Sequence, residues 1–207
     1  MSLRVKVCGI TDVDDALMAV RFGASAVGML FWPKSPRAID RETAREIVRA
    51  LPPFVQAVGV FVNQPDADAI ASDVGLHAVQ LHGDEPVGHY ARYVHRVIKA
   101  VAVGSYGAHD QARVIPSGVH VLLDAHDPVR RGGTGTTIEW SLAAAIAAER
   151  PVILSGGLNP SNVAEAIRAV KPAAIDVSSG VELSPGRKDR ERLRAFFDAV
   201  HRCEPTP

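Results

Sequence analysis

Short apolar runs recur along the chain, and most are followed by a turn signal and then by helix-forming sequence. We interpret the runs as eight β-strands at about residues 3–8, 26–30, 55–61, 77–81, 94–101, 119–124, 152–155 and 173–178. Because parallel neighbours need a crossover connection, strands that alternate with helices predict a parallel α/β sheet. A closed barrel of this kind needs at least about 200 residues, and the chain has 207. Eight units in so short a chain favour a (β/α)8 TIM barrel over the alternative, an open doubly wound α/β fold.

The first helix is marked by its capping residues. The segment Thr11-Asp12-Val13-Asp14 resembles a capping box with Asp in place of Glu. The helix that follows is expected to turn Val13, Leu17 and Val20 inward and to end at Gly23.

Two later helices have similar signals. Asp40 predicts the N-cap of a helix over residues 41–51, which Pro52-Pro53 ends. Asn159-Pro160 predicts a cap followed by proline in the first turn, opening an alanine-rich helix that ends near Pro172.

The charge balance and the apolar runs exclude several classes of partner. Lysine and arginine number 23, as do aspartate and glutamate, so no electrostatic footprint indicates nucleic acid or an anionic membrane surface. No apolar stretch approaches the ~18 residues that span a bilayer, and the N-terminus lacks the pattern of a secretory signal. No linker divides the chain, so residues 1–207 are expected to form one domain. We expect a soluble cytoplasmic protein.

Neither the cysteines nor the histidines form a metal-binding pattern. Cys8 and Cys203 are too far apart to form a CxxC pair, and we expect both to be reduced; a disulfide between them is the alternative. His126 and Asp127 lie beside Asp124, but no spaced set of further ligands accompanies them. We therefore expect no metal.

The strand ends carry the residues that matter for function. In a β/α barrel the active site forms at the C-terminal ends of the strands. Here those ends carry Cys8, Gln80 to Gly83, Asp124, Ser155 to Gly157 and Ser178 to Gly180. Tight turns alone explain glycines at these places, but not a cysteine, an aspartate and paired serines.

The last two strand ends predict a phosphate site. Ser155-Gly156-Gly157 follows the seventh strand and Ser178-Ser179-Gly180 follows the eighth. The loops after these strands are the customary phosphate site of this fold, because their backbone N–H groups and a helix N-terminus bind the anion. The substrate is therefore expected to carry a phosphate monoester.

Three ionisable groups have competing explanations. A free cysteine such as Cys8 is often only a small buried hydrophobe, yet its position before Gly9 at a strand end suits a reactive thiol. Asp124 ends a continuous apolar run, where an unpartnered carboxylate is costly. Asp176 could contact a substrate hydroxyl or cap a neighbouring loop, and the sequence leaves both open.

Other polar residues are weaker candidates. Arg37 lies in a loop stiffened by prolines and suits a carboxylate, although a surface arginine is the alternative. His82 could reach the barrel mouth or face solvent. The Gly132–Gly135 segment is interpreted as a flap over the sixth strand, with a plain surface loop as the alternative.

Taken together, the motifs resemble the phosphoribosylanthranilate isomerase family of tryptophan biosynthesis over almost the full chain. They lie at residues 6–11, 35–37, 58–63, 80–85, 122–124, 132–135, 156–160, 176–182 and 185–189. The family fold is a β/α barrel. Its reaction is an Amadori rearrangement of N-(5′-phosphoribosyl)anthranilate that uses neither metal nor cofactor.

The resemblance implies a role for each candidate residue. Asp124 is the general acid that opens the furanose ring, and Cys8 is the general base that removes the proton from C2′. Arg37 grips the anthranilate carboxylate. The remaining expected substrate contacts are Gln80, His82, Gly133, Gly156, Gly157, Asp176, Ser178 and Ser179. The partner is thus a small phosphosugar-anthranilate molecule, and the protein is expected to be a monomer or homodimer.

Two rival functions remain. A relative that also isomerises the histidine-pathway aminoimidazole substrate carries aspartate at the first-strand base position, where this chain has Cys8. A catalytically silent phosphosugar-binding protein would not need Cys8, Asp124 and Arg37 together. The departures from the family pattern are Ile138-Glu139-Trp140 in place of Phe-Asp-Trp and Ser155 in place of alanine; they bear on loop packing.

Overall fold

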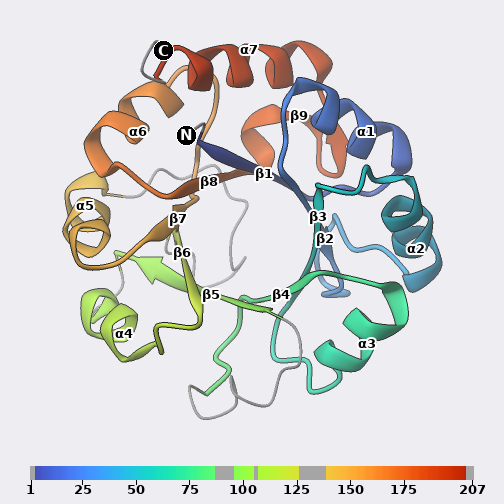
Figure 1. Ribbon diagram of the computed structural model, residues 1–207, viewed down its shortest axis with the longest axis horizontal. Coiled ribbons are helices and arrows are strands. Elements are labelled where there is room, and N and C mark those ends of the chain that lie inside the picture. The colour runs from blue at the N-terminus through green and yellow to red at the C-terminus, as the bar shows by residue number, and fades with distance from the viewer. Residues whose placement is uncertain (1–2, 87–95, 105–106, 126–138, 204–207) are drawn as a thin grey trace.

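The computed structural model describes residues 3–86, 96–104, 107–125 and 139–203. Eight parallel strands form a closed barrel in chain order, and β8 pairs back onto β1 (Figure 1). The strands are β1 (Arg4–Cys8), β2 (Ala26–Leu30), β3 (Gln56–Phe61), β4 (Ala78–Leu81), β5 (Arg96–Val103), β6 (His120–Ala125), β7 (Val152–Leu154) and β8 (Ala174–Val177). The closure confirms the predicted (β/α)8 barrel and excludes the open sheet.

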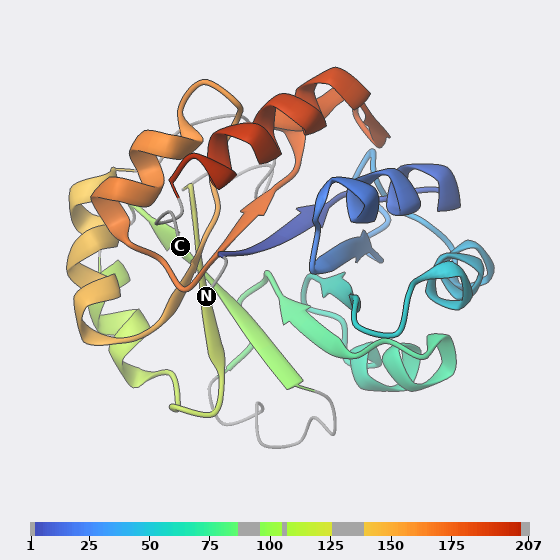
Figure 2. The ribbon, with the colours of Figure 1, turned by 45° about the horizontal axis from the view of Figure 1, so that its top comes forward.

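Helices surround the barrel (Figure 1). They are α1 (Val13–Phe22), α2 (Arg41–Ala50), α3 (Ala67–Val74), α4 (Ala108–Val114), α5 (Trp140–Glu149), α6 (Val163–Val170) and α7 (Arg190–His201). Helix α7 packs against both α6 and α1, and so covers the seam where the last strand meets the first (Figures 1 and 2). No helix in these ranges is long and apolar enough to cross a membrane.

A short antiparallel pair lies between β8 and α7. The chain leaves β8 through a 3₁₀ turn, η2 (Ser179–Val181), and then forms β9 (Glu182–Ser184) and β10 (Arg187–Lys188). This pair returns the chain towards the end of β1, where Thr11 Oγ1 donates to the Gly186 carbonyl at 2.6 Å.

Each strand divides its side chains between the barrel interior and the helices. On β1, Val5 and Val7 join the large core beneath the helices, whereas Lys6 and Cys8 lie on the opposite, interior face because side chains alternate along a strand. A second, smaller apolar cluster fills the barrel interior. It consists of Val58, Ala78, Ile98 and Leu122.

The start of α1 differs from the prediction. Asp12 rather than Thr11 is the N-cap, since its carboxylate accepts from Asp15 N at 2.8 Å and the Thr11 hydroxyl is used elsewhere. The fully buried residues of the helix are Ala16 and Ala19. The residues predicted to face inward are only partly buried: Val13, Leu17 and Val20. The predicted end at Gly23 is confirmed by its left-handed backbone.

Of the N-caps predicted for the other two helices, the one of α2 is confirmed and the one of α6 is wrong. Asp40 caps α2 and accepts from Thr43 N at 2.8 Å. Asn159 does not cap α6: its side chain accepts from Ser161 N at 2.9 Å, which forms a local turn, and the helix begins at Val163 after Asn162. The proline signal therefore marked a turn that precedes the helix.

Candidate active site

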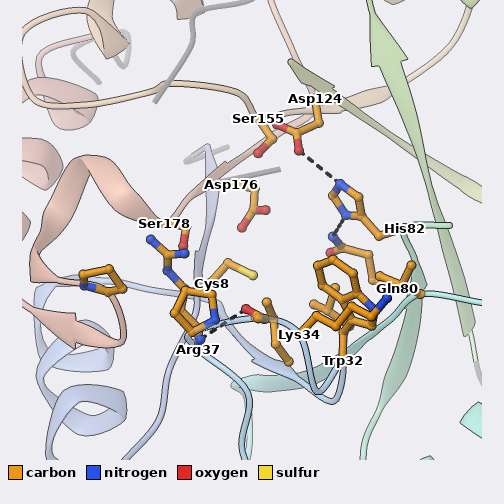
Figure 3. Close-up of a pocket in the computed structure, with 16 residues that line it drawn as sticks. Cys8, Trp32, Lys34, Arg37, Gln80, His82, Asp124, Ser155, Asp176 and Ser178 are labelled. Carbon is orange, nitrogen blue, oxygen red and sulfur yellow. Dashed lines mark hydrogen bonds and ion pairs between the residues drawn. The ribbon is translucent and has the colours of Figure 1, made fainter. Parts of the chain in front are cut away.

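A cavity of about 560 Å³ opens at the C-terminal ends of the strands. Most of the predicted site residues line it. They are Cys8, Arg37, Gln80, His82, Asp124, Asp176 and Ser178 (Figure 3). Gly156, Gly157 and Ser179 are chain neighbours of the lining serines at 155 and 178, while Gly133 and the rest of the predicted flap lie outside the described residues. The barrel thus gathers residues from seven strand ends around one space.

One wall of this cavity is apolar. It is formed by Leu30, Trp32, Pro36, Val60 and Val62, from the ends of β2 and β3 and the loops that follow them. A flat aromatic group can pack on such a surface, because burying apolar area is favourable and an indole ring stacks readily. No role could be predicted for these residues from the sequence, since apolar residues near strand ends also serve as ordinary core.

Cys8 lies at the floor of the cavity beside a buried ion pair. Lys6 Nζ lies 2.9 Å from Asp176 Oδ1, and both residues are at most 5% exposed. Strands β1 and β8 pair these two residues directly in register. Burial raises the pKa of the Cys8 thiol, and the nearby ammonium groups of Lys6 and Lys188 oppose that rise. Both Cys8 and Cys203 are free thiols, so the alternative of a disulfide is excluded.

On the other side of the cavity, Asp124 is the end of a hydrogen-bonded chain of side chains (Figure 3). His82 Nε2 lies 3.1 Å from Asp124 Oδ2, and Gln80 Nε2 lies 3.2 Å from His82 Nδ1. With the Gln80 amide donating to Nδ1, a neutral imidazole carries its proton on Nε2 and donates it to Asp124. His82 therefore orients Asp124, and the alternative that His82 faces solvent is excluded.

Gln80 has a further group that matters. Its Oε1 is buried and has no hydrogen-bond partner among the residues that the structure describes. A buried acceptor without a partner costs free energy, so this oxygen is suited to accept from a ligand in the cavity.

Arg37 is not a surface residue, since it is 9% exposed. Glu182 accepts three hydrogen bonds from its guanidinium, from Nε to Oε1 at 2.9 Å and to Oε2 at 3.1 Å, and from Nη2 to Oε2 at 2.6 Å. Glu182 Oε1 also accepts from Lys188 Nζ at 2.7 Å, and the same Nζ donates to the Cys8 carbonyl at 2.6 Å. Although burial raises it, these donors hold the pKa of Glu182 below its usual value. Within the part of the chain that the structure describes, Arg37 Nη1 has no hydrogen-bond partner, so it can meet an anion.

Gly9 is the point where three loops meet. Its φ is +77°, a left-handed conformation that favours glycine. A Cβ at this position would lie 2.7 Å from Arg37 Cδ and 2.9 Å from Ser178 Oγ. Any larger residue would therefore push the arginine and the serine out of place.

The two predicted phosphate loops are in contact with each other. A Cβ on Gly180 would lie only 1.9 Å from the Leu158 carbonyl oxygen, so the loop after β8 passes directly against the loop after β7. Asn162 Nδ2 donates to the Gly157 carbonyl at 2.9 Å and so fixes the loop after β7. The pair forms one continuous backbone surface beside Ser155 and Ser178.

Three charged residues of this region were not predicted to have a role: Lys6, Glu182 and Lys188. Lys6 carried a signal, because a lysine between two valines of a buried strand is costly without a partner. Glu182 and Lys188 lay inside matched motifs, but no local pattern joins either of them to Arg37. Within the described ranges, no group of three or more histidine, cysteine, aspartate or glutamate side chains is placed to hold a metal ion.

Comparison with known proteins gives the family of the chain. Residues 5–199 match the family described as N-(5′-phosphoribosyl)anthranilate (PRA) isomerase. An N-(5′-phosphoribosyl)anthranilate isomerase of Geobacter sulfurreducens is 50% identical over 197 residues, which are 94% of this chain and 97% of that protein. The chain belongs to this family. The expected assignment to the isomerases of tryptophan biosynthesis is thereby confirmed.

Solved structures of family members agree with this assignment. The Thermotoga maritima phosphoribosyl anthranilate isomerase superposes with a TM-score of 0.89 at 45% identity, over 96% of this chain and 98% of that one. A family member in complex with reduced 1-(o-carboxyphenylamino)-1-deoxyribulose 5-phosphate superposes with a TM-score of 0.85 at 44% identity, with the same coverage. The barrel of this chain therefore matches that of solved PRA isomerases.

Proposed function

We propose that Asp124 and Cys8 are the acid and base of the isomerisation of N-(5′-phosphoribosyl)anthranilate in this chain. The observation that supports this proposal is that both side chains line one cavity, Asp124 at the end of β6 and Cys8 at the end of β1. Asp124 donates a proton to the furanose ring oxygen as the bond from C1′ to that oxygen breaks, and the anilino nitrogen forms a Schiff base. The Cys8 thiolate then takes the proton from C2′, and the electron pair of that bond forms the enolamine, which tautomerises to the ketone.

The two ends of the substrate are proposed to bind on either side of this pair. The aromatic ring packs on the apolar wall with Trp32, and its carboxylate meets the Nη1 end of Arg37. The phosphate binds at the loops 155–157 and 178–180, whose glycines let the backbone approach the anion. Holding both ends orients the sugar between acid and base, which is a large part of the catalytic effect in a unimolecular rearrangement.

The remaining polar residues are proposed to contact the sugar. Gln80 Oε1 is the buried acceptor described above and suits a hydroxyl donor. Asp176 lines the cavity, and its Oδ1 accepts from Lys6 Nζ. Its other carboxylate oxygen can therefore accept from a second hydroxyl. His82 acts through Asp124, which it orients.

Replacing Arg37 with alanine is expected to raise KM by about 10-fold or more, with a smaller change in kcat, because the lost contact binds substrate and transition state alike. It also leaves Glu182 with one partner fewer, so the free energy of unfolding is expected to fall by about 1–3 kcal/mol. Steady-state kinetics and chemical denaturation check the two effects. Arg37→Lys keeps the charge but loses the two-pronged contact with Glu182. An unchanged KM in Arg37→Ala would discredit the carboxylate role.

The pH dependence of kcat/KM is expected to report the thiol. The base form is the thiolate, and burial raises the pKa of Cys8 above its ordinary value of about 8.5. Since the thiolate fraction grows as pH rises towards that pKa, kcat/KM should still be increasing at pH 8.5. A profile that is flat from pH 7 to pH 9 would contradict a protonated resting thiol.

The function is tested by a turnover assay with freshly made phosphoribosylanthranilate. Formation of the deoxyribulose phosphate product is the expected result. Binding of the substrate without turnover would favour the silent phosphosugar-binding protein. Comparable turnover of the histidine-pathway aminoimidazole substrate would favour a two-substrate isomerase, which the cysteine at position 8 argues against.

We also infer that the chain is one domain over residues 1–207, because the elements of the barrel extend from Arg4 to His201. A cytoplasmic location stays a prediction, as do the lack of a cofactor and the choice between monomer and homodimer. Sedimentation velocity over a range of protein concentrations distinguishes the two oligomeric states.

A further inference from the structure

Lys6 is a buried charge that the proposed mechanism does not use. It lies two residues before Cys8 on β1, so both side chains face the barrel interior. It is 5% exposed, and Asp176 accepts from its Nζ at 2.9 Å. Burying an ion pair has a desolvation cost that its mutual attraction often does not exceed. The pair is therefore poorly explained by stability alone.

Gly28 on β2 provides the space in which Lys6 and Cys8 meet. A Cβ at this position would lie 2.7 Å from Cys8 Sγ, 2.9 Å from Lys6 Cε and 3.1 Å from Lys6 Nζ. The thiol and the ammonium thus converge over the same glycine, at the floor of the cavity. Register supports the arrangement, because β1 and β2 pair Cys8 with Gly28.

The charged groups that face Cys8 come from three strands. Lys6 on β1 and Lys188 on β10 oppose the effect of burial and lower the pKa of the thiol, whereas Asp176 on β8 raises it. Lys188 is balanced by Glu182 on β9, at 2.7 Å. The other ionisable groups that line the cavity are Lys34, Arg37, His82 and Asp124. Of all these, Lys6 is the cation whose ammonium shares the space over Gly28 with the thiol.

We propose that Lys6 is a positioning residue for Cys8, and that its ammonium, fixed by Asp176, stabilises the thiolate that removes the substrate proton. The proposal rests on the proposed base role of Cys8. Lys6 does not compete for the proton. Burial lowers its pKa, but Asp176 and the thiol raise the pKa by more, so the amine stays charged.

The test measures the thiolate directly, without substrate. The rate at which iodoacetamide alkylates Cys8 is followed from pH 6 to pH 11 in a Cys203→Ser background, so that a single thiol reacts. In Lys6→Met the alkylation profile is expected to move to higher pH, with a rate at pH 8 about 10-fold lower. The pH profile of kcat/KM should move in the same direction.

Asp176→Asn provides a change of opposite sign. Removing this carboxylate takes a repulsive charge away from the thiolate. The asparagine amide oxygen can still accept from the Lys6 ammonium, and the thiolate itself still raises the pKa of Lys6. The alkylation profile of Asp176→Asn is therefore expected to move to lower pH, with a faster rate at pH 8. A merely structural role for the pair predicts that both variants shift the profile in the same direction, or not at all.

Lys6→Met leaves Asp176 buried without its partner and could unfold the protein. The double variant Lys6→Met/Asp176→Asn removes both charges together, so no unpaired charge is left buried. Its alkylation rate can be compared with that of Asp176→Asn alone. It is expected to alkylate about 10-fold more slowly at pH 8 than Asp176→Asn alone. Equal rates in these two variants would overturn the proposal. Because alkylation needs no turnover, that outcome is distinct from failure of the base role, which a fully active Cys8→Ala enzyme would show.

Discussion

Cys8→Ala is expected to lower kcat by about 10²-fold or more while the protein stays folded. The reason is that a methyl group cannot accept the proton from C2′, while the phosphate loops, the apolar wall and Arg37 are left in place. The Cys8 side chain makes no cross-link, and its removal takes away only one small buried group. KM is therefore expected to change much less than kcat.

The chain offers a matched control for this experiment. Cys203 is the other free thiol, and it lies beyond α7, where its Sγ is 3.5 Å from the Ala199 carbonyl. Cys203→Ala should leave kcat and KM unchanged. Cys8→Ser is a second informative variant, because a hydroxyl fills the same space but is a far weaker acid, so its kcat should also be low. Near-normal turnover in Cys8→Ala would remove the thiol from the mechanism.

Asp124→Asn is expected to have an effect of the same size, again about 10²-fold or more in kcat. The amide is nearly isosteric with the carboxyl group, and it can still accept from His82 Nε2, which lies 3.1 Å from Asp124 Oδ2. It has no acidic proton for the ring oxygen, so ring opening loses its catalyst. Substrate binding and the melting temperature should change little.

Asp40→Asn is the control for that substitution. Asp40 is exposed at the N-cap of α2 and does not line the cavity, and asparagine caps a helix about as well as aspartate. Full activity is expected in Asp40→Asn. If Asp124→Asn also kept most of its activity, the general acid would have to be another group of the cavity, and His82 would be examined next.

Several features of the fold could be predicted because they are local. The capping aspartate at position 40 accepts from a backbone amide three residues away, and short-range chemistry of this kind is visible in the sequence. One error arose where a local signal competed with a distant contact. Thr11 was predicted as part of a capping box, but its hydroxyl bonds to Gly186, which is 175 residues away.

In the site, too, local features could be predicted from the sequence and distant contacts could not. The positions of Cys8, Gln80, His82 and Asp124 at strand ends were predictable, because the rule that active sites form at the C-terminal ends of barrel strands needs only the strand order. Their partners were not. The orientation of Asp124 by His82 depends on the ends of two strands, β6 and β4, and the two residues are 42 positions apart in sequence. The apolar wall around Trp32 depends on how the loop after β2 folds back.

Local patterns along the chain are enough to predict the alternation of apolar runs and helices, and hence a barrel with a thiol, a carboxylate and two glycine-serine loops at one end. Which charges neutralise one another depends on how the barrel closes. Lys6 meets Asp176 across 170 residues and Arg37 meets Glu182 across 145, because closure of the barrel sets β1 beside β8. Such pairs depend on strand register and side-chain direction in the closed barrel, and no periodicity along a single segment records them.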